Sequence, residues 1–170
     1  MEIQKSEPDP FEKDIICKLH LFDHIPQGKW GNKLAGHDVK NAVGEVAEKR
    51  GYKVRAHATD YSYAERGEWL YDLTCIEYEG GHIKGIPLVM ESEWDRNGVD
   101  DDFPKLVVAR ADHRVMVLQV ESDEDKEEII QQLLQHVQKC RHSTEGDRYL
   151  FACWNRVGRS FDCPVYIVVG

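Results

Sequence analysis

Residues 85–94, GIPLVMESEW, combine an apolar run with two glutamates at alternate positions. The run from Ile86 to Met90 is typical of a buried β-strand. Alternate side chains of a strand lie on one face, so Glu91 and Glu93 are expected side by side at its end. Like charges in close contact repel each other and resist desolvation, so this strand end needs a compensating group.

Two further strands are predicted before this one, over residues 52–59 (YKVRAHAT) and 68–78 (EWLYDLTCIEY). The second ends at the turn signal EGG, and the short connections predict an antiparallel meander of three strands. Asp72 interrupts the apolar pattern of the second strand, where an aspartate is disfavoured. Pairing of the second and third strands would bring Asp72 next to Glu91.

The segment after the glutamates predicts a crossover to a fourth strand. Residues 95–101 (DRNGVDD) are expected to form a loop, and a short helix is expected to begin near Asp102, with Lys105 in its first turn. The apolar stretch 114–120 (RVMVLQV) is the fourth strand. A right-handed crossover through the helix makes it parallel to the third strand, so the sheet is mixed.

The remaining elements flank this core at both ends of the chain. Asp9 is expected to cap an N-terminal helix over residues 9–24. Residues 1–8 are expected to be a loose tail and residues 25–36 a glycine-rich loop. A second helix over residues 38–50 ends at Gly51, and a long amphipathic helix is predicted over residues 122–140. Two closing strands, over residues 148–157 and 163–169, are joined by the turn GRSFD.

Composition limits the class of protein. The chain has 170 residues and a formal net charge of -9, which argues against a general nucleic-acid coat protein but not against an enzyme with an acidic metal site. The five cysteines form no C-x-x-C pair, and no apolar run is long enough to span a membrane. We therefore expect a cytoplasmic protein with no membrane partner, built as a single domain over residues 1–170.

The order of elements over residues 38–120 and the spacing of Asp72, Glu91 and Glu93 resemble the PD-(D/E)XK nuclease superfamily. In that family, an αβββαβ core carries an Asp early in its second strand and a (D/E)-x-K pair in its third. Here YDL supplies Asp72 and ESE supplies the pair, with Glu93 in the place of the usual lysine. The resemblance implies the restriction-endonuclease-like α/β (α+β) fold, with helices flanking the mixed central sheet.

The resemblance also implies a site and an activity. Asp72 and Glu91 would bind Mg²⁺ or Mn²⁺, and Glu45, at the border of the apolar helix stripe, would join them in preference to Glu48. Glu93 completes the catalytic set, with Lys105 as a lysine that has migrated from the third strand. The implied function is that of a Mg-dependent, endonuclease-like phosphodiesterase that acts on nucleic acid, DNA in preference to RNA, as a homodimer.

Two other interpretations remain open at this point. The missing lysine and the net charge of -9 also fit a catalytically inactive module of the nuclease fold that acts in protein interaction or regulation. A plain structural domain with solubilising acids is the third. Arg156 and Arg159, close to the aromatic Trp154 and Phe161, are candidates for binding nucleic acid, or they belong to an ordinary solvated turn.

Overall fold

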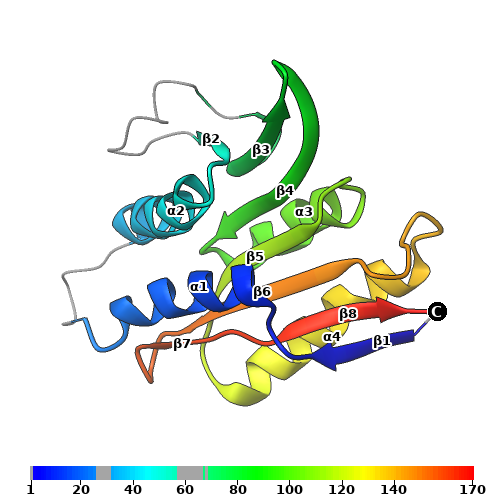
Figure 1. The fold of residues 1–170 in the computed structure, drawn as a ribbon. Coiled ribbons are helices and arrows are strands. Elements are labelled where there is room, and N and C mark those ends of the chain that lie inside the picture. The colour runs from blue at the N-terminus through cyan, green and yellow to red at the C-terminus, as the bar shows by residue number, and fades with distance from the viewer. Residues whose placement is uncertain (1, 26–31, 57–66, 68) are drawn as a thin grey trace.

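A mixed sheet of eight strands forms the centre of the part of the chain that the computed structural model describes, residues 2–25, 32–56, 67 and 69–170 (Figure 1). The strand order is β1-β8-β6-β5-β4-β3-β2, and β7 pairs with β6 outside this path. The strands are β1 (Glu2–Ser6), β2 (Lys53–Ala56), β3 (Leu73–Glu79), β4 (His82–Glu93), β5 (His113–Val120), β6 (Arg148–Asn155), β7 (Ser160–Asp162) and β8 (Val165–Val169). The helices are α1 (Pro10–Leu19), α2 (Asn32–Lys49), α3 (Arg96–Val107) and α4 (Asp123–Lys139), with a short 3₁₀ helix η1 (His20–Phe22).

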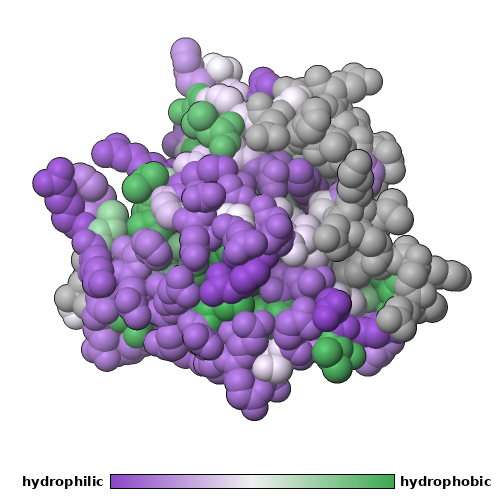
Figure 2. Space-filling model, turned by 180° about the vertical axis from the view of Figure 1, so that it is seen from behind, coloured by the Kyte–Doolittle hydropathy of each residue, from purple (hydrophilic) through white to green (hydrophobic). Residues whose placement is uncertain are grey.

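Helices cover both faces of the sheet, and each face has its own apolar core. Leu88 and Met90 of β4 face a core with side chains of α1 and α2, whereas Val89 faces a core with side chains of α3 and α4. This alternation is what a strand buried on both sides requires. Seen from the other side of the molecule, the surface is mostly hydrophilic, with apolar side chains in separate small patches (Figure 2).

The predicted mixed topology is confirmed. Strands β2, β3 and β4 form an antiparallel meander, and β4 and β5 are parallel neighbours joined through α3. A second crossover, through α4, makes β5 and β6 parallel as well. Because parallel strands run in the same direction, β4, β5 and β6 all end at one edge of the sheet.

Several predicted boundaries were wrong, and long-range contacts explain one of them. Residues 2–6 are not a loose tail but the edge strand β1, which pairs antiparallel with β8 at the far end of the chain. Only one of these five residues is apolar, so no local pattern signals the strand. The predicted N-cap of α1 is confirmed, because the Asp9 side chain accepts hydrogen bonds from the backbone of Phe11 and Glu12.

Two helices begin earlier than the sequence predicts. Helix α2 begins at Asn32, inside the expected loop, and α3 begins at Arg96 rather than near Asp102. Asp95 caps α3 by accepting a 3.0 Å hydrogen bond from the Asn97 backbone N–H. Gly98 and Pro104 are poor formers of helix interiors and concealed this start. Lys105 therefore lies in the last turn of α3, not in the first.

Strand β3 begins at Leu73, so Asp72 immediately precedes the strand instead of lying inside it. The residues before it are irregular, with Leu70 at a positive φ of 70°. The turn predicted at GRSFD contains β7, which pairs with β6. The expected loop at 25–36 and the end of the first predicted strand fall partly on residues outside the described ranges. None of the helices in the described ranges has both the length and the apolar content needed to cross a membrane.

Candidate active site

Asp72 and Glu91 meet across the β3–β4 pair, as the sequence predicts. Leu73 pairs with Met90, so the antiparallel register places Asp72 opposite Glu91. The Ser92 backbone N–H donates a 2.9 Å hydrogen bond to Asp72 Oδ2, which holds the carboxylate at this position. Two acids that are 19 residues apart in the sequence thereby become neighbours.

Glu91 is the buried member of the pair. The residue is 3 % exposed, and within the described residues its Oε1 atom has no hydrogen-bond partner. The pKa of Glu91 is raised to about 7, chiefly by burial and then by the negative charge of Asp72, while the nearby Lys105 ammonium acts in the opposite direction. A cation next to Glu91 would stabilise the ionised form of its carboxyl group.

Lys105 is the first cation beside this pair. Its ammonium group lies 3.5 Å from Glu91 Oε1 and 2.6 Å from Asp102 Oδ1. The hydrogen bond to Asp102 raises the pKa of Lys105, and the charge of Glu91 acts in the same direction. Helix α3 packs against β4, so its last turn comes back to Glu91. The sequence predicts Lys105 in the first turn of this helix, whereas the structure places it in the last turn, beside Glu91.

Lys40 is the second cation, and no sequence pattern predicted it. This residue of α2 places its ammonium group 3.0 Å from Asp72 Oδ1, and its side chain is largely buried. Glu45, the helix acid expected here, instead forms a 2.7 Å ion pair with Lys18 of α1. Positions 40 and 45 lie about 140° apart around a helix, because each residue turns it by about 100°. The only sequence feature that pointed to Lys40 was its position next to Val39, which belongs to the apolar stripe of this helix.

Glu93 has a different neighbourhood from Glu91. Its Oε1 accepts a 2.7 Å hydrogen bond from the Asp95 backbone N–H, at the turn that leads from β4 into α3. Its carboxyl group also lies against Gly98, where an added Cβ atom would be 2.4 Å from Glu93 Oε2. The absence of a side chain at Gly98 therefore gives the Glu93 carboxyl group the space that it needs to accept this hydrogen bond.

The donor set fits a Mg²⁺ or Mn²⁺ ion that is bound mainly by water and substrate. Among the described residues, no group of three or more His, Cys, Asp or Glu side chains is placed to hold a metal ion. Mg²⁺ is commonly bound through one or two carboxylates, together with waters and substrate phosphates. The Asp72–Glu91 pair matches that pattern, because Glu91 Oε1 is buried without a hydrogen-bond partner and has the Lys105 ammonium 3.5 Å away.

The candidate nucleic-acid residues Arg156 and Arg159 lie in the turn between β6 and β7. Arg156 forms a 2.8 Å ion pair with Glu121, and Arg159 has a positive φ of 56°. The aromatic rings nearby are core residues: Trp154 and Phe161 are buried, with ring centroids 5.2 Å apart. Neither ring is placed to stack on a base, and β5 separates this turn from β4.

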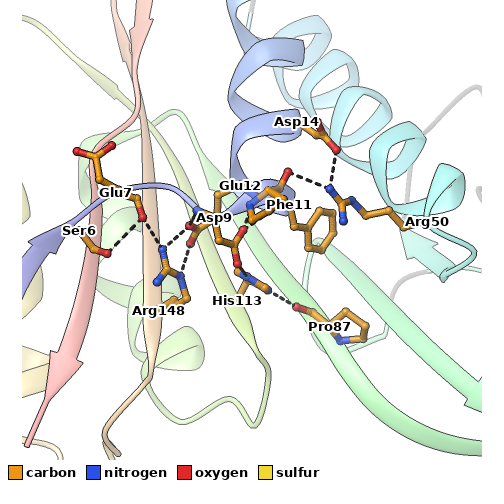
Figure 3. A network of polar contacts seen from close by, with 11 residues as sticks. Ser6, Glu7, Asp9, Phe11, Glu12, Asp14, Arg50, Pro87, His113 and Arg148 are labelled. Carbon is orange, nitrogen blue, oxygen red and sulfur yellow. Dashed lines mark hydrogen bonds and ion pairs between the residues drawn. The ribbon is translucent and has the colours of Figure 1, made fainter.

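A second polar cluster ties α1 to the sheet (Figure 3). Glu12 is fully buried and accepts hydrogen bonds from Arg148 at 3.0 and 2.6 Å. The His113 ring lies between the Pro87 carbonyl oxygen, 2.9 Å away, and Asp9 Oδ2, 2.6 Å away. Burial raises the pKa of Asp9, but hydrogen bonds from the Glu12 backbone and His113 outweigh it, and the pKa is lowered. These charges satisfy one another, which indicates a structural role.

The candidate active site is therefore the cluster of Asp72, Glu91, Lys105 and Lys40, in which each carboxylate has an ammonium neighbour. Its members come from the segment before β3, from β4, from α3 and from α2. Comparisons of the chain with protein-family models, with curated proteins and with solved structures found no match.

Proposed function

We propose that the chain is a Mg²⁺- or Mn²⁺-dependent phosphodiesterase of the restriction-endonuclease-like fold, acting on nucleic acid at the Asp72–Glu91 cluster. The observation that carries this proposal is the register that sets Asp72 opposite Glu91, whose Oε1 atom is buried without a hydrogen-bond partner. A meander followed by a parallel crossover is also the topology that the resemblance implies. We propose DNA rather than RNA as the substrate, and a homodimer that cuts both strands.

In this proposal Asp72 and Glu91 hold the metal ion. Such an ion supplies charge stabilisation for the phosphate and lowers the pKa of a bound water. Glu91 has a pKa of about 7, so near neutral pH a cation and a proton compete for it. Ion binding should therefore release a proton, which is a direct chemical signature of this site.

The two lysines have separate roles. The Lys105 side chain is 49 % exposed, so its ammonium group can reach a phosphate oxygen or an attacking water while it stays near Glu91. Lys40 is buried against Asp72 and is a positioning residue, because it orients that carboxylate together with the Ser92 N–H. Glu93 supports the start of α3 in this account.

A second candidate function has an observation of its own in its favour. Lys40 and Lys105 already give Asp72 and Glu91 cationic neighbours at 3.0 and 3.5 Å. Charge compensation by lysines needs no metal, and Glu93 is engaged at the helix start. A catalytically inactive module of the same fold, acting in protein interaction or regulation, would keep this arrangement for stability.

Calorimetric titration with Mn²⁺ and Mg²⁺ separates the two functions. The phosphodiesterase requires saturable binding that is lost in Asp72→Asn and in Glu91→Gln. It also requires that binding persists in the control Glu79→Gln, which removes a charge from the exposed β3–β4 hairpin. Absence of divalent-ion binding to the folded protein at millimolar concentration would contradict the phosphodiesterase and favour the inactive module.

A further inference from the structure

A cavity of about 740 Å³ lies near the other end of β4. Its wall combines residues of β4, the end of α3, the start of β5 and the segment after α4. Ile86, in this wall, is five residues from Glu91, which is about 16 Å along a strand at about 3.3 Å per residue. The cavity is therefore separate from the candidate active site. Its volume is typical of sites that bind small organic molecules.

The cavity wall carries more positive than negative charge. Arg110, Arg114 and Arg141 line it, together with Asp112 and Asp147. Three arginines against two aspartates leave a local charge of +1, in a chain whose net charge is -9. This local charge favours an anion in the cavity.

Arg114 is held in the wall with part of its hydrogen-bonding capacity unused. The residue is 4 % exposed. Its Nε atom donates to the Leu106 carbonyl at 3.1 Å, and Nη2 donates to the Ala109 carbonyl at 2.8 Å and to Asp147 Oδ1 at 3.0 Å. Its Nη1 atom is buried and has no partner among the described residues. The guanidinium carbon of Arg114 also lies 5.2 Å from the centroid of the Tyr149 ring, so this side chain is fixed as part of the cavity wall.

The other two arginines are exposed at the cavity rim. Neither Arg110 nor Arg141 forms an ion pair with a carboxylate of the described residues. Arg141 Nε lies 3.4 Å from His142 Nε2, so these two polar side chains are adjacent. Guanidinium groups match the geometry of phosphate oxygens through paired N–H donors.

We infer that this cavity binds the phosphate group of a small organic phosphate. Arg110 and Arg141 contact the phosphate from the rim, and Arg114 fixes the wall behind it. The apolar residues Ile86 and Val108 provide a surface for the organic part of the ligand. This site is independent of the phosphodiesterase proposal, because it lies at a different place on the sheet and needs no metal.

Titrations followed by ¹H–¹⁵N NMR test the site, with pyrophosphate, adenosine 5′-monophosphate and adenosine as probes. We expect saturable shifts of the amides of residues 109–112 and 141–144 with the two phosphates, and none with adenosine. The double variant Arg110→Ala/Arg141→Ala should weaken binding at least about tenfold, which corresponds to the loss of one charged hydrogen bond. Both arginines are exposed, so this variant should fold.

The matched control is Lys13→Ala/Lys139→Ala, which removes the same charge from two exposed sites outside the cavity wall. It should bind both phosphates like the wild-type protein. If pyrophosphate gives no saturable shifts at these amides, or if the lysine control loses as much affinity as the arginine variant, the inference is wrong. A stronger response to the nucleotide than to pyrophosphate would support the role of Ile86 and Val108.

Discussion

Asp72 accepts a hydrogen bond from the backbone of Ser92, the residue between the two glutamates of the ESE sequence. This bond continues the β3–β4 pairing by one step, with a side chain in place of a backbone carbonyl. It fixes Asp72 opposite Glu91 and orients its other oxygen toward Lys40, 3.0 Å away. The electrostatics of the cluster depend on this placement, so its charges can be tested one at a time.

The first prediction concerns the pKa of Glu91 and uses two opposite substitutions. Asp72→Asn keeps an acceptor for the Ser92 N–H but removes a negative charge, so the pKa of Glu91 should fall below its value of about 7. Lys105→Met removes a positive neighbour, so the pKa should rise. Carboxyl ¹³C NMR titration measures both shifts. Equal pKa values in the two variants would show that these charges do not surround Glu91.

The second prediction is the pH dependence of stability that Glu91 contributes. Its pKa is raised from 4.5 to about 7 in the folded protein, so the folded state binds the proton more tightly. The stabilisation is fully present below about pH 4.5 and is lost as the pH rises through about 7. Its upper limit is about 3.5 kcal/mol, at about 1.4 kcal/mol per unit of pKa.

Urea unfolding at several pH values checks this dependence. The free energy of unfolding of the wild-type protein should fall more steeply between about pH 5 and pH 8 than that of Glu91→Gln, which cannot titrate. The comparison removes the effects of other titrating groups, because both proteins share them. Parallel pH profiles would contradict the raised pKa.

The third prediction separates the two glutamates of the ESE sequence. Glu93→Gln weakens the acceptor for the Asp95 N–H, so it should cost about 1 kcal/mol of stability while catalysis and metal binding remain. Glu91→Gln should abolish metal binding. Thermal unfolding together with calorimetric titration of both variants checks this. A loss of metal binding in Glu93→Gln would place that carboxylate in the site after all.

The fourth prediction concerns the buried ion pair between Arg148 and Glu12. Arg148→Met leaves a fully buried carboxylate without its main partner and should lower the free energy of unfolding by about 3 kcal/mol or more. Lys84→Met is the control, because Lys84 pairs with Glu77 at an exposed hairpin and should contribute less than about 1 kcal/mol. Chemical denaturation of both variants measures the difference. Similar small losses would refute the structural role of this cluster.

The sequence predicted those parts of the fold that depend on local patterns. Apolar runs and the EGG turn located β3, β4 and β5, and their short connections predicted both the meander and the parallel crossover. Edge strand β1 was missed because its pairing partner, β8, lies at the far end of the chain. The start of α3 was missed because the cap at Asp95 is followed by Gly98, which helix propensity alone does not favour.

The candidate site shows the same division. Asp72 and Glu91 were predictable because strand register follows from hairpin geometry. Lys40 was not, because its contact with Asp72 depends on how α2 rotates over the sheet, which no local pattern encodes. The same rotation of α2 turns Glu45 toward α1, where it pairs with Lys18, and not toward Asp72.

The phosphodiesterase is tested most directly by single-turnover cleavage of end-labelled DNA and RNA by the wild-type protein and by Asp72→Asn. We predict cleavage of DNA in the presence of Mg²⁺ or Mn²⁺, no cleavage when EDTA is added, and no detectable cleavage by Asp72→Asn. The Ser92 N–H keeps its acceptor in this variant, so a lost activity reports the carboxylate charge rather than a misplaced strand. Cleavage by Asp72→Asn at a rate close to that of the wild-type protein would contradict the assignment of this site.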